Sequence, residues 1–123
     1  MDEKFKSLLE ENGVDVKNTI KRFMGKEEMY QKFLGKFMSD QNYDNLGKNL
    51  EEKNYEEAYK CAHTLKGVTA NLGLDPIQSV VSDLVEELRG KKAEEVDEMK
   101  VNAKWQDVKS TYERFYEIIS QNQ

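Results

Sequence analysis

The sequence of 123 residues predicts an all-α protein, an antiparallel up-and-down four-helix bundle with additional short N-terminal capping helices. Two observations predict this class. Apolar residues recur three and four positions apart through most of the chain, whereas no stretch alternates apolar and polar residues as a strand does. Capping residues and glycines divide the pattern into segments with short connections, which make consecutive helices antiparallel neighbours.

The N-terminal part predicts two short helices that cap one end of the bundle. Asp15 can cap the first helix, which Gly25 would end, and the second is expected over residues 27–39. We expect the capping helices within residues 1–39 and the four-helix bundle over about residues 41–120, all in a single domain.

The first two bundle helices are predicted to meet at Asn54. The earlier helix follows the segment SDQNYDN and runs to about Lys53, although Gly47 in its interior costs about 1 kcal/mol relative to alanine. Asn54, with a glutamate three residues later, has the spacing of a capping box, so the next helix is expected over residues 54–72. Gly73 is well placed to end it.

Two further helices complete the predicted bundle. Asp75 can cap a new helix and Pro76 is tolerated at its first position, so the third bundle helix is expected to run to about Arg89. The last helix is expected over residues 93–120, with a bend near Asn102. The bend is expected because Val96 and Met99 fit its apolar stripe less well than Val101, Trp105, Val108, Tyr112, Phe115 and Ile119.

Composition excludes several classes of function. The net charge is -5 with both signs mixed, which argues against a nucleic-acid binder. A single histidine and a single cysteine are too few for a zinc or haem site and exclude an intramolecular disulfide. The chain has no phosphate-binding glycine motif, no membrane-spanning apolar run and no signal-peptide core, so we expect a cytoplasmic protein that does not bind ATP.

The only histidine, His63, lies at the edge of the core-facing stripe of helix 54–72. That stripe has the spacing four, three, four, three and consists of Ala58, Ala62, Leu65, Thr69 and Leu72. His63 is displaced from the stripe by about 100°, with Tyr59, Lys66 and Gly67 one turn away on the same face. We therefore expect the imidazole at the edge of the bundle, partly in water.

This arrangement suits a histidine that carries a phosphoryl group. A neutral imidazole is a nucleophile at pH 7, and Lys66 could reach the added negative charge. Gly67 and Ala70 would leave room for a partner to approach. Taken alone, each residue also has a plain structural reading: His63 as a core-edge histidine, Lys66 as a solvated lysine, and Gly67 as a close contact between helices.

The segment AHTLKG at residues 62–67, followed by NLG at residues 71–73, closely resembles the signature of histidine-containing phosphotransfer (HPt) domains of multistep phosphorelays. The resemblance extends to most of the chain. It implies that His63 accepts a phosphoryl group from the aspartyl phosphate of a receiver domain and passes it to another. It also implies that Lys66 steadies the phosphohistidine and that Gly67 makes room for the receiver. The magnesium ion used in transfer would belong to the receiver, so no metal or cofactor is expected in this chain.

The docking surface follows partly from the bundle. Folding the chain about Leu74 places His63 level with Val85, and Arg89 one turn further on. Receivers of this family meet an apolar patch around the histidine, so the candidate partner-binding residues are Tyr59, Ala70 and Asn71, with any apolar groups exposed by helix 41–53.

Three functions remain open from the sequence. The first is a free-standing phosphocarrier between receiver domains, with a hybrid histidine kinase as a further candidate partner. The second is a phosphotransfer module served by an ATP-dependent histidine kinase domain, and the third is a non-phosphorylated adaptor that binds a receiver, or a plain structural bundle. The start methionine and the lack of a kinase domain favour the first, and the family is usually monomeric.

Overall fold

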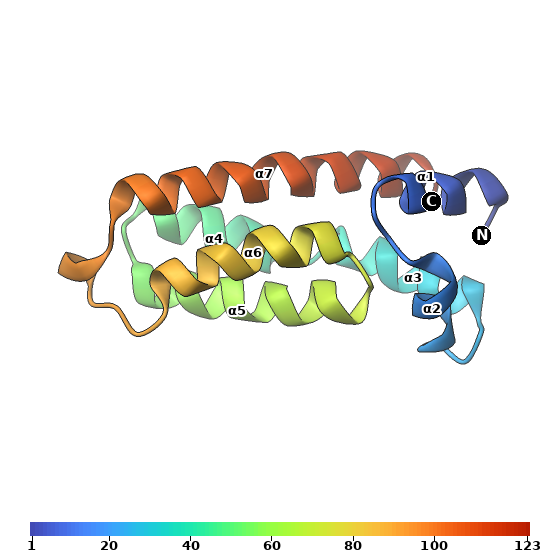
Figure 1. The fold of residues 1–123 in the computed structure, drawn as a ribbon, viewed down its shortest axis with the longest axis horizontal. Coiled ribbons are helices and arrows are strands. Elements are labelled where there is room, and N and C mark those ends of the chain that lie inside the picture. The colour runs from blue at the N-terminus through green and yellow to red at the C-terminus, as the bar shows by residue number, and fades with distance from the viewer.

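A computed structural model describes all 123 residues of the chain. It is entirely helical, as predicted, and contains no strand. Figure 1 shows the helices in chain order. Their bounds are α1 (Glu3–Glu11), α2 (Val16–Lys21), α3 (Glu27–Phe37), α4 (Asn42–Glu51), α5 (Tyr55–Asn71), α6 (Asp75–Leu88) and α7 (Glu98–Gln121), with a short 3₁₀ turn, η1 (Ala93–Glu95), before α7.

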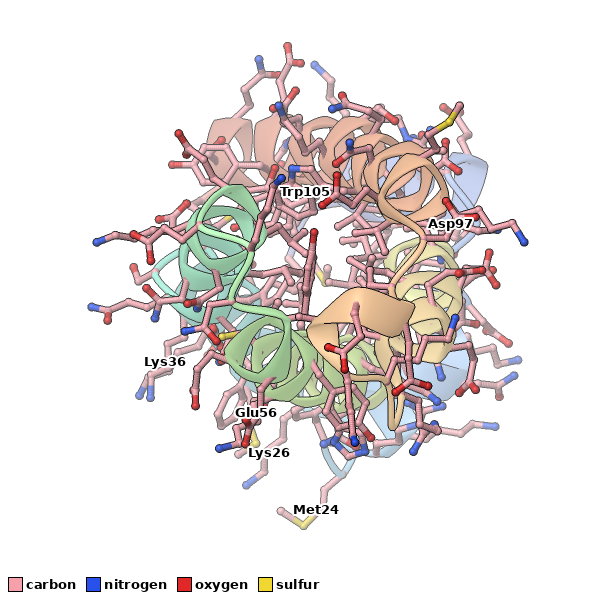
Figure 2. The ribbon with its side chains drawn as sticks, turned by 90° about the vertical axis from the view of Figure 1, so that its left-hand side faces the viewer. Met24, Lys26, Lys36, Glu56, Asp97 and Trp105 are labelled. Atoms are coloured by element: carbon pink, nitrogen blue, oxygen red, sulfur yellow. The ribbon has the colours of Figure 1, made fainter.

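Helices α4 to α7 form an antiparallel bundle. Each packs against the next along the chain, α4 on α5, α5 on α6 and α6 on α7. Helices α1, α2 and α3 gather at one end, where α5 ends and α6 begins (Figure 1). Both chain termini lie at that end. Viewed along the bundle, the four helices surround a common core (Figure 2).

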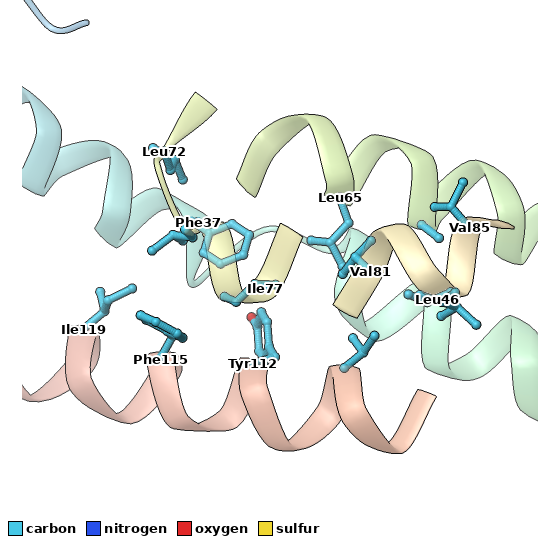
Figure 3. Packing of buried hydrophobic residues seen from close by; sticks show 14 of the residues in the cluster. Phe37, Leu46, Leu65, Leu72, Ile77, Val81, Val85, Tyr112, Phe115 and Ile119 are labelled. Carbon is cyan, nitrogen blue, oxygen red and sulfur yellow. The ribbon is translucent and has the colours of Figure 1, made fainter. Parts of the chain in front are cut away.

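The core is one cluster of 26 buried hydrophobic residues. Helix α7 contributes a continuous row to it, and in the close view Tyr112, Phe115 and Ile119 face Phe37 of α3 and Ile77 of α6 (Figure 3). The predicted core stripe of α5 is fully confirmed, because all five of its residues are buried. Burial of these side chains provides the main force for association of the helices.

Two hydrogen bonds attach the capping helices to the end of α5. The buried hydroxyl of Tyr30 in α3 donates to the carbonyl oxygen of Leu72 at 2.8 Å. Arg22, at the end of α2, donates from Nη1 to the carbonyl oxygen of Ala70 at 2.7 Å. The bond from Tyr30 satisfies a carbonyl group that the helix end leaves without a backbone partner, whereas the Ala70 carbonyl also accepts from the backbone N–H of Gly73 at 3.1 Å. The capping helices are thereby fixed against the helix that carries His63.

The structure contains a helix that the sequence prediction lacks. Helix α1 begins after Asp2, whose carboxylate accepts a hydrogen bond from the backbone N–H of Phe5 at 2.8 Å. Phe5 and Leu9 are buried in the core, and α1 packs against α7. The prediction missed it because so short an amphipathic segment is stabilised by packing against distant helices rather than by its own propensity.

The boundaries of the last two helices also need correction. Helix α7 begins at Glu98 and continues through Asn102 without interruption, so the break lies earlier, at Val96 and Asp97. Val96 is buried but precedes the helix, and Met99 is 84% exposed, which explains why neither fits the stripe. The expected cap at Asp75 is wrong as well, since Leu74 occupies that position without a side-chain hydrogen bond.

Other predicted caps are confirmed. The Asp15 carboxylate accepts from the backbone N–H of Asn18 at 3.2 Å, and the Asn54 side chain accepts from that of Glu57 at 3.5 Å.

No helix in the structure combines the length and apolar character needed to cross a membrane.

Candidate functional site

Helix α5 presents His63 to solvent at the edge of its buried stripe. Ala62 and Leu65, on either side in sequence, are fully buried, whereas His63 and Thr64 are exposed. The side chain of His63 makes no hydrogen bond and no ion pair with the protein. Both ring nitrogens are therefore accessible to a reactant from outside, as the position of His63 on the helix predicted.

Tyr59 lies one turn before His63 and packs against it. The two ring centroids are 5.8 Å apart, and the ring planes are inclined at 45°. Together with Lys60 and Thr64, the two rings line a shallow hollow on the outer face of α5. The imidazole therefore has an aromatic neighbour on one side and open solvent on the other.

Lys66 and Gly67 lie one turn after His63. Lys66 is half-buried and has no carboxylate partner, whereas Lys60 pairs with Glu57 at 3.3 Å. A Cβ atom on Gly67 would meet nothing within 4 Å, so no helix of the bundle approaches this glycine. This open space excludes the reading of Gly67 as a close contact between helices. The structure thus leaves a free ammonium group and an unobstructed surface beside the imidazole.

An apolar groove continues this face toward the end of α5. It has a volume of about 320 Å³ and is lined by Phe23, Phe33, Lys36, Phe37, Asp40, Val68, Asn71 and Leu72. Asn71 is exposed at its edge, and Ala70 is half-buried beside Arg22. Its apolar side chains come from the turn after α2, from α3 and from the end of α5, and α4, the helix expected to expose apolar groups here, contributes none of them.

Arg89 at the end of α6 reaches the other end of the face. Its Nη1 donates to the hydroxyl of Tyr59 at 2.9 Å, and its Nε lies 3.2 Å from a carboxylate oxygen of Glu86. The sequence, with the chain folded about Leu74, predicted that Arg89 would lie one turn beyond the level of His63. The contact with Tyr59 could not be predicted, because it depends on the conformation of both long side chains.

Nothing in the structure resembles a metal site, since no three His, Cys, Asp or Glu side chains cluster. Cys61 is half-buried on the side of α5 that faces α4, where Asn49 lies 3.9 Å from its sulfur, and burial raises the pKa of its thiol. A raised pKa leaves less reactive thiolate at neutral pH. The nucleophile that this face offers is therefore the imidazole of His63.

Comparison with known protein families gives one match. Residues 28–115, well over half of the chain, match the family model described as Hpt domain. This range contains His63, Lys66 and Gly67, and it includes all of α5. No curated protein and no solved structure matches the chain.

Proposed function

The chain belongs to the Hpt domain family, and we propose that it is a phosphorelay intermediate in which His63 carries the phosphoryl group. Hpt domains are phosphocarrier modules of two-component signalling, not kinases, and they interact with receiver domains. The observation that carries the proposal for His63 is its position: the only histidine of the chain lies on an exposed helix face beside an unpaired lysine.

The proposed reaction is a phosphoryl transfer from an aspartyl phosphate of a receiver. A ring nitrogen of His63 attacks phosphorus, an N–P bond forms, and the O–P bond breaks to return the aspartate as a carboxylate. The second transfer reverses these changes with the aspartate of another receiver. Lys66 neutralises part of the added charge as a mobile ammonium group. The magnesium ion belongs to the receiver, and this chain supplies no cofactor.

We propose that the receiver covers the face from Tyr59 to Asn71. Gly67 allows close approach beside the imidazole, and Ala70 adds little bulk beyond it. The apolar groove next to Asn71 would take apolar side chains of the receiver. Met24 directly follows Phe23, which lines the groove; its side chain is 75% exposed and projects outside the four bundle helices, beyond α5 (Figure 2).

Met24 has a backbone φ of 57°, in the left-handed region that few residues other than glycine adopt. Such a conformation costs energy and persists where the surrounding structure holds it. The exposed side chain of Met24 is thus presented to solvent one residue after a side chain of the groove. This supports a role in contact with a partner.

The test is transfer of labelled phosphate from phosphorylated receivers to the wild-type protein and to His63→Gln. Phosphohistidine is labile in acid and stable in base, so the label on the wild type should show this pattern and should be absent from His63→Gln. Circular dichroism checks that the variant is folded. Label that persists in His63→Gln, or no transfer from any receiver of the same cell, would overturn the proposal.

The same assay distinguishes the alternatives. A histidine kinase domain with ATP replaces the receiver as donor in a parallel reaction. Labelling by the kinase alone would indicate a module served directly by a kinase. Binding of receivers without any labelling would indicate an adaptor. We further propose that the chain works in the cytoplasm as a monomeric single domain, without a nucleic-acid or membrane partner, which its lone cysteine and acidic net charge support.

A further inference from the structure

Three side chains from two helices form a connected row on the face of α5. Arg89 of α6 donates to the Tyr59 hydroxyl at 2.9 Å, and the Tyr59 ring lies 5.8 Å from the His63 ring, centroid to centroid. The Arg89 guanidinium also lies 5.6 Å from the centre of the Tyr59 ring. Glu86 holds the same guanidinium from the other side, with 3.2 Å between Nε and a carboxylate oxygen.

We propose that Tyr59 is a positioning residue for His63 and that Arg89 holds it in place. This inference rests on the proposed phosphotransfer function of His63. It assigns Tyr59 a role within the free protein, in addition to contact with a receiver. Tyr59 would restrict the orientation of the imidazole before the partner arrives.

The geometry of the helix explains why Tyr59 can do this. Side chains on an α-helix lean toward its N-terminus, so the imidazole of His63 lies over the turn that carries Tyr59. The other residues of the hollow cannot restrict it as well. Thr64 is small and exposed, and the ammonium group of Lys60 pairs with Glu57.

Restriction of the imidazole has a calculable effect on rate. An exposed histidine on a helix has about two accessible χ1 wells and a roughly two-fold χ2, so selecting one arrangement out of about four raises its population about fourfold. A reacting nitrogen held in the productive orientation reacts faster because less entropy is lost in the transition state. The role of Tyr59 is therefore expected to be modest in size but measurable.

Arg89 matters because it fixes Tyr59 from outside α5. Without this hydrogen bond, the half-buried Tyr59 ring would be held only by its packing against the core, and its exposed part could change its orientation together with His63. A hydrogen bond from a charged donor is stronger than one between neutral groups. Tyr59→Phe keeps the ring and removes the bond, whereas Tyr59→Leu removes both, so the two variants separate the two parts of the proposal.

The first experiment is NMR of the imidazole, which is unambiguous because the chain has only one histidine. In the wild type, side-chain couplings and ring shifts should indicate one preferred rotamer. In Tyr59→Leu they should approach the values of a freely rotating side chain. Tyr59→Phe and Arg89→Gln should both give an intermediate result, larger for Arg89→Gln because it also removes the guanidinium from the Tyr59 ring. Combining them should add less than the sum of the two effects, because they share one hydrogen bond.

The second experiment measures phosphorylation of His63 by phosphoramidate, a small donor that needs no docking surface. Tyr59→Leu should slow this reaction about fourfold, the factor expected from the loss of rotamer selection. With a phosphorylated receiver, the maximal rate should fall by the same factor. Tyr116→Leu and Arg114→Gln, which change an exposed tyrosine and an exposed arginine on α7, are the matched controls and should behave as the wild type.

Unchanged NMR parameters and an unchanged phosphoramidate rate in Tyr59→Leu would overturn the proposal. So would a variant that only raises the receiver concentration needed for half-maximal transfer, because that result assigns Tyr59 to docking alone. Neither the NMR nor the phosphoramidate measurement requires a receiver. A failure of all receivers to donate would therefore count against the proposed function and leave the positioning role separately measurable.

Discussion

Gly47 of α4 lies directly against the indole of Trp105 on α7. A Cβ atom on Gly47 would come within 2.9 Å of Cζ2 of Trp105, which is closer than two carbon atoms pack without a bond. Tyr43 lies at the same seam, 5.4 Å from Trp105 between ring centroids and stacked on Tyr112 at 3.6 Å. The glycine that weakens α4 as a helix therefore lets α4 and α7 close the bundle.

Substitution of Gly47 tests this close approach. Gly47→Ala gains about 1 kcal/mol of helix propensity but must displace Trp105, so its free energy of unfolding should remain within about 1 kcal/mol of the wild type. The larger side chain of Gly47→Leu does not fit beside Trp105, so the free energy of unfolding of this variant should be about 1–3 kcal/mol lower than that of the wild type, the usual cost of overpacking. Urea unfolding followed by fluorescence of Trp105, the only tryptophan, measures both. Wild-type stability in Gly47→Leu would contradict the packing described.

Gly67 should respond in the opposite way, because a side chain there meets open space. Gly67→Ala and Gly67→Gln should raise the free energy of unfolding by up to about 1 kcal/mol, since glycine is the poorest helix former except proline. Gly67→Gln should nevertheless impair transfer from receivers, because its side chain occupies the surface beside His63. Urea unfolding and the transfer assay are run on the same preparations. Normal transfer by a stabilised Gly67→Gln would remove the glycine from the docking surface.

These two glycines show what the sequence can and cannot predict. Both interrupt amphipathic helices, and the helical period alone does not distinguish them. The period correctly placed the buried stripe of α5 and, by exclusion, the exposed position of His63, because those depend on one helix only. The indole beneath Gly47 and the groove formed by Phe23 and Phe33 depend on which side chains of separate helices meet, which a one-dimensional pattern does not contain.

The aromatic seam between α4 and α7 should make stability depend on pH in the alkaline range. Burial, together with negative charge on Asp44 and Tyr43, raises the pKa of Tyr112 to about 12. Burial likewise raises the pKa of Tyr43 to about 12. The unfolded chain has ordinary tyrosines with pKa values of about 10, so it loses these protons first. The stabilisation is therefore fully present below about pH 10 and is lost as pH rises toward about pH 12.

Urea unfolding at a series of alkaline pH values checks this dependence. Tyr112→Phe has no phenol proton at this position, so its free energy of unfolding should fall less steeply with pH than that of the wild type. Tyr116→Phe, on the exposed side of α7, is the matched control and should follow the wild type more closely than Tyr112→Phe, because the charge of Tyr116 is only a minor cause of the raised pKa of Tyr112. Equal slopes in Tyr112→Phe and the wild type would show that the buried phenol does not contribute.

Lys66 should contribute to phosphoryl chemistry and little to the fold. Its side chain has no ion-pair partner, so Lys66→Ala should leave the free energy of unfolding within about 0.5 kcal/mol of the wild type, as for most surface changes. The variant should accept the phosphoryl group more slowly or lose it sooner, because no ammonium group offsets its charge. Lys60→Ala is the control, since Lys60 lies equally near in sequence but pairs with Glu57. Equal rates and lifetimes in Lys66→Ala and the wild type would exclude Lys66 from the mechanism.

The apolar groove beside α5 should determine receiver affinity rather than chemistry. Phe33 is 40% exposed at the groove, so Phe33→Ser removes apolar surface that a receiver would cover without opening the core. We expect receiver binding about tenfold weaker, corresponding to the loss of roughly 1.4 kcal/mol from one partly buried aromatic contact. Phosphorylation by phosphoramidate should stay unchanged, because that donor does not touch the groove. Met99→Ser is the control, since Met99 is also exposed but lies at the start of α7, outside the groove. Wild-type affinity in Phe33→Ser would place the receiver elsewhere on the face of α5.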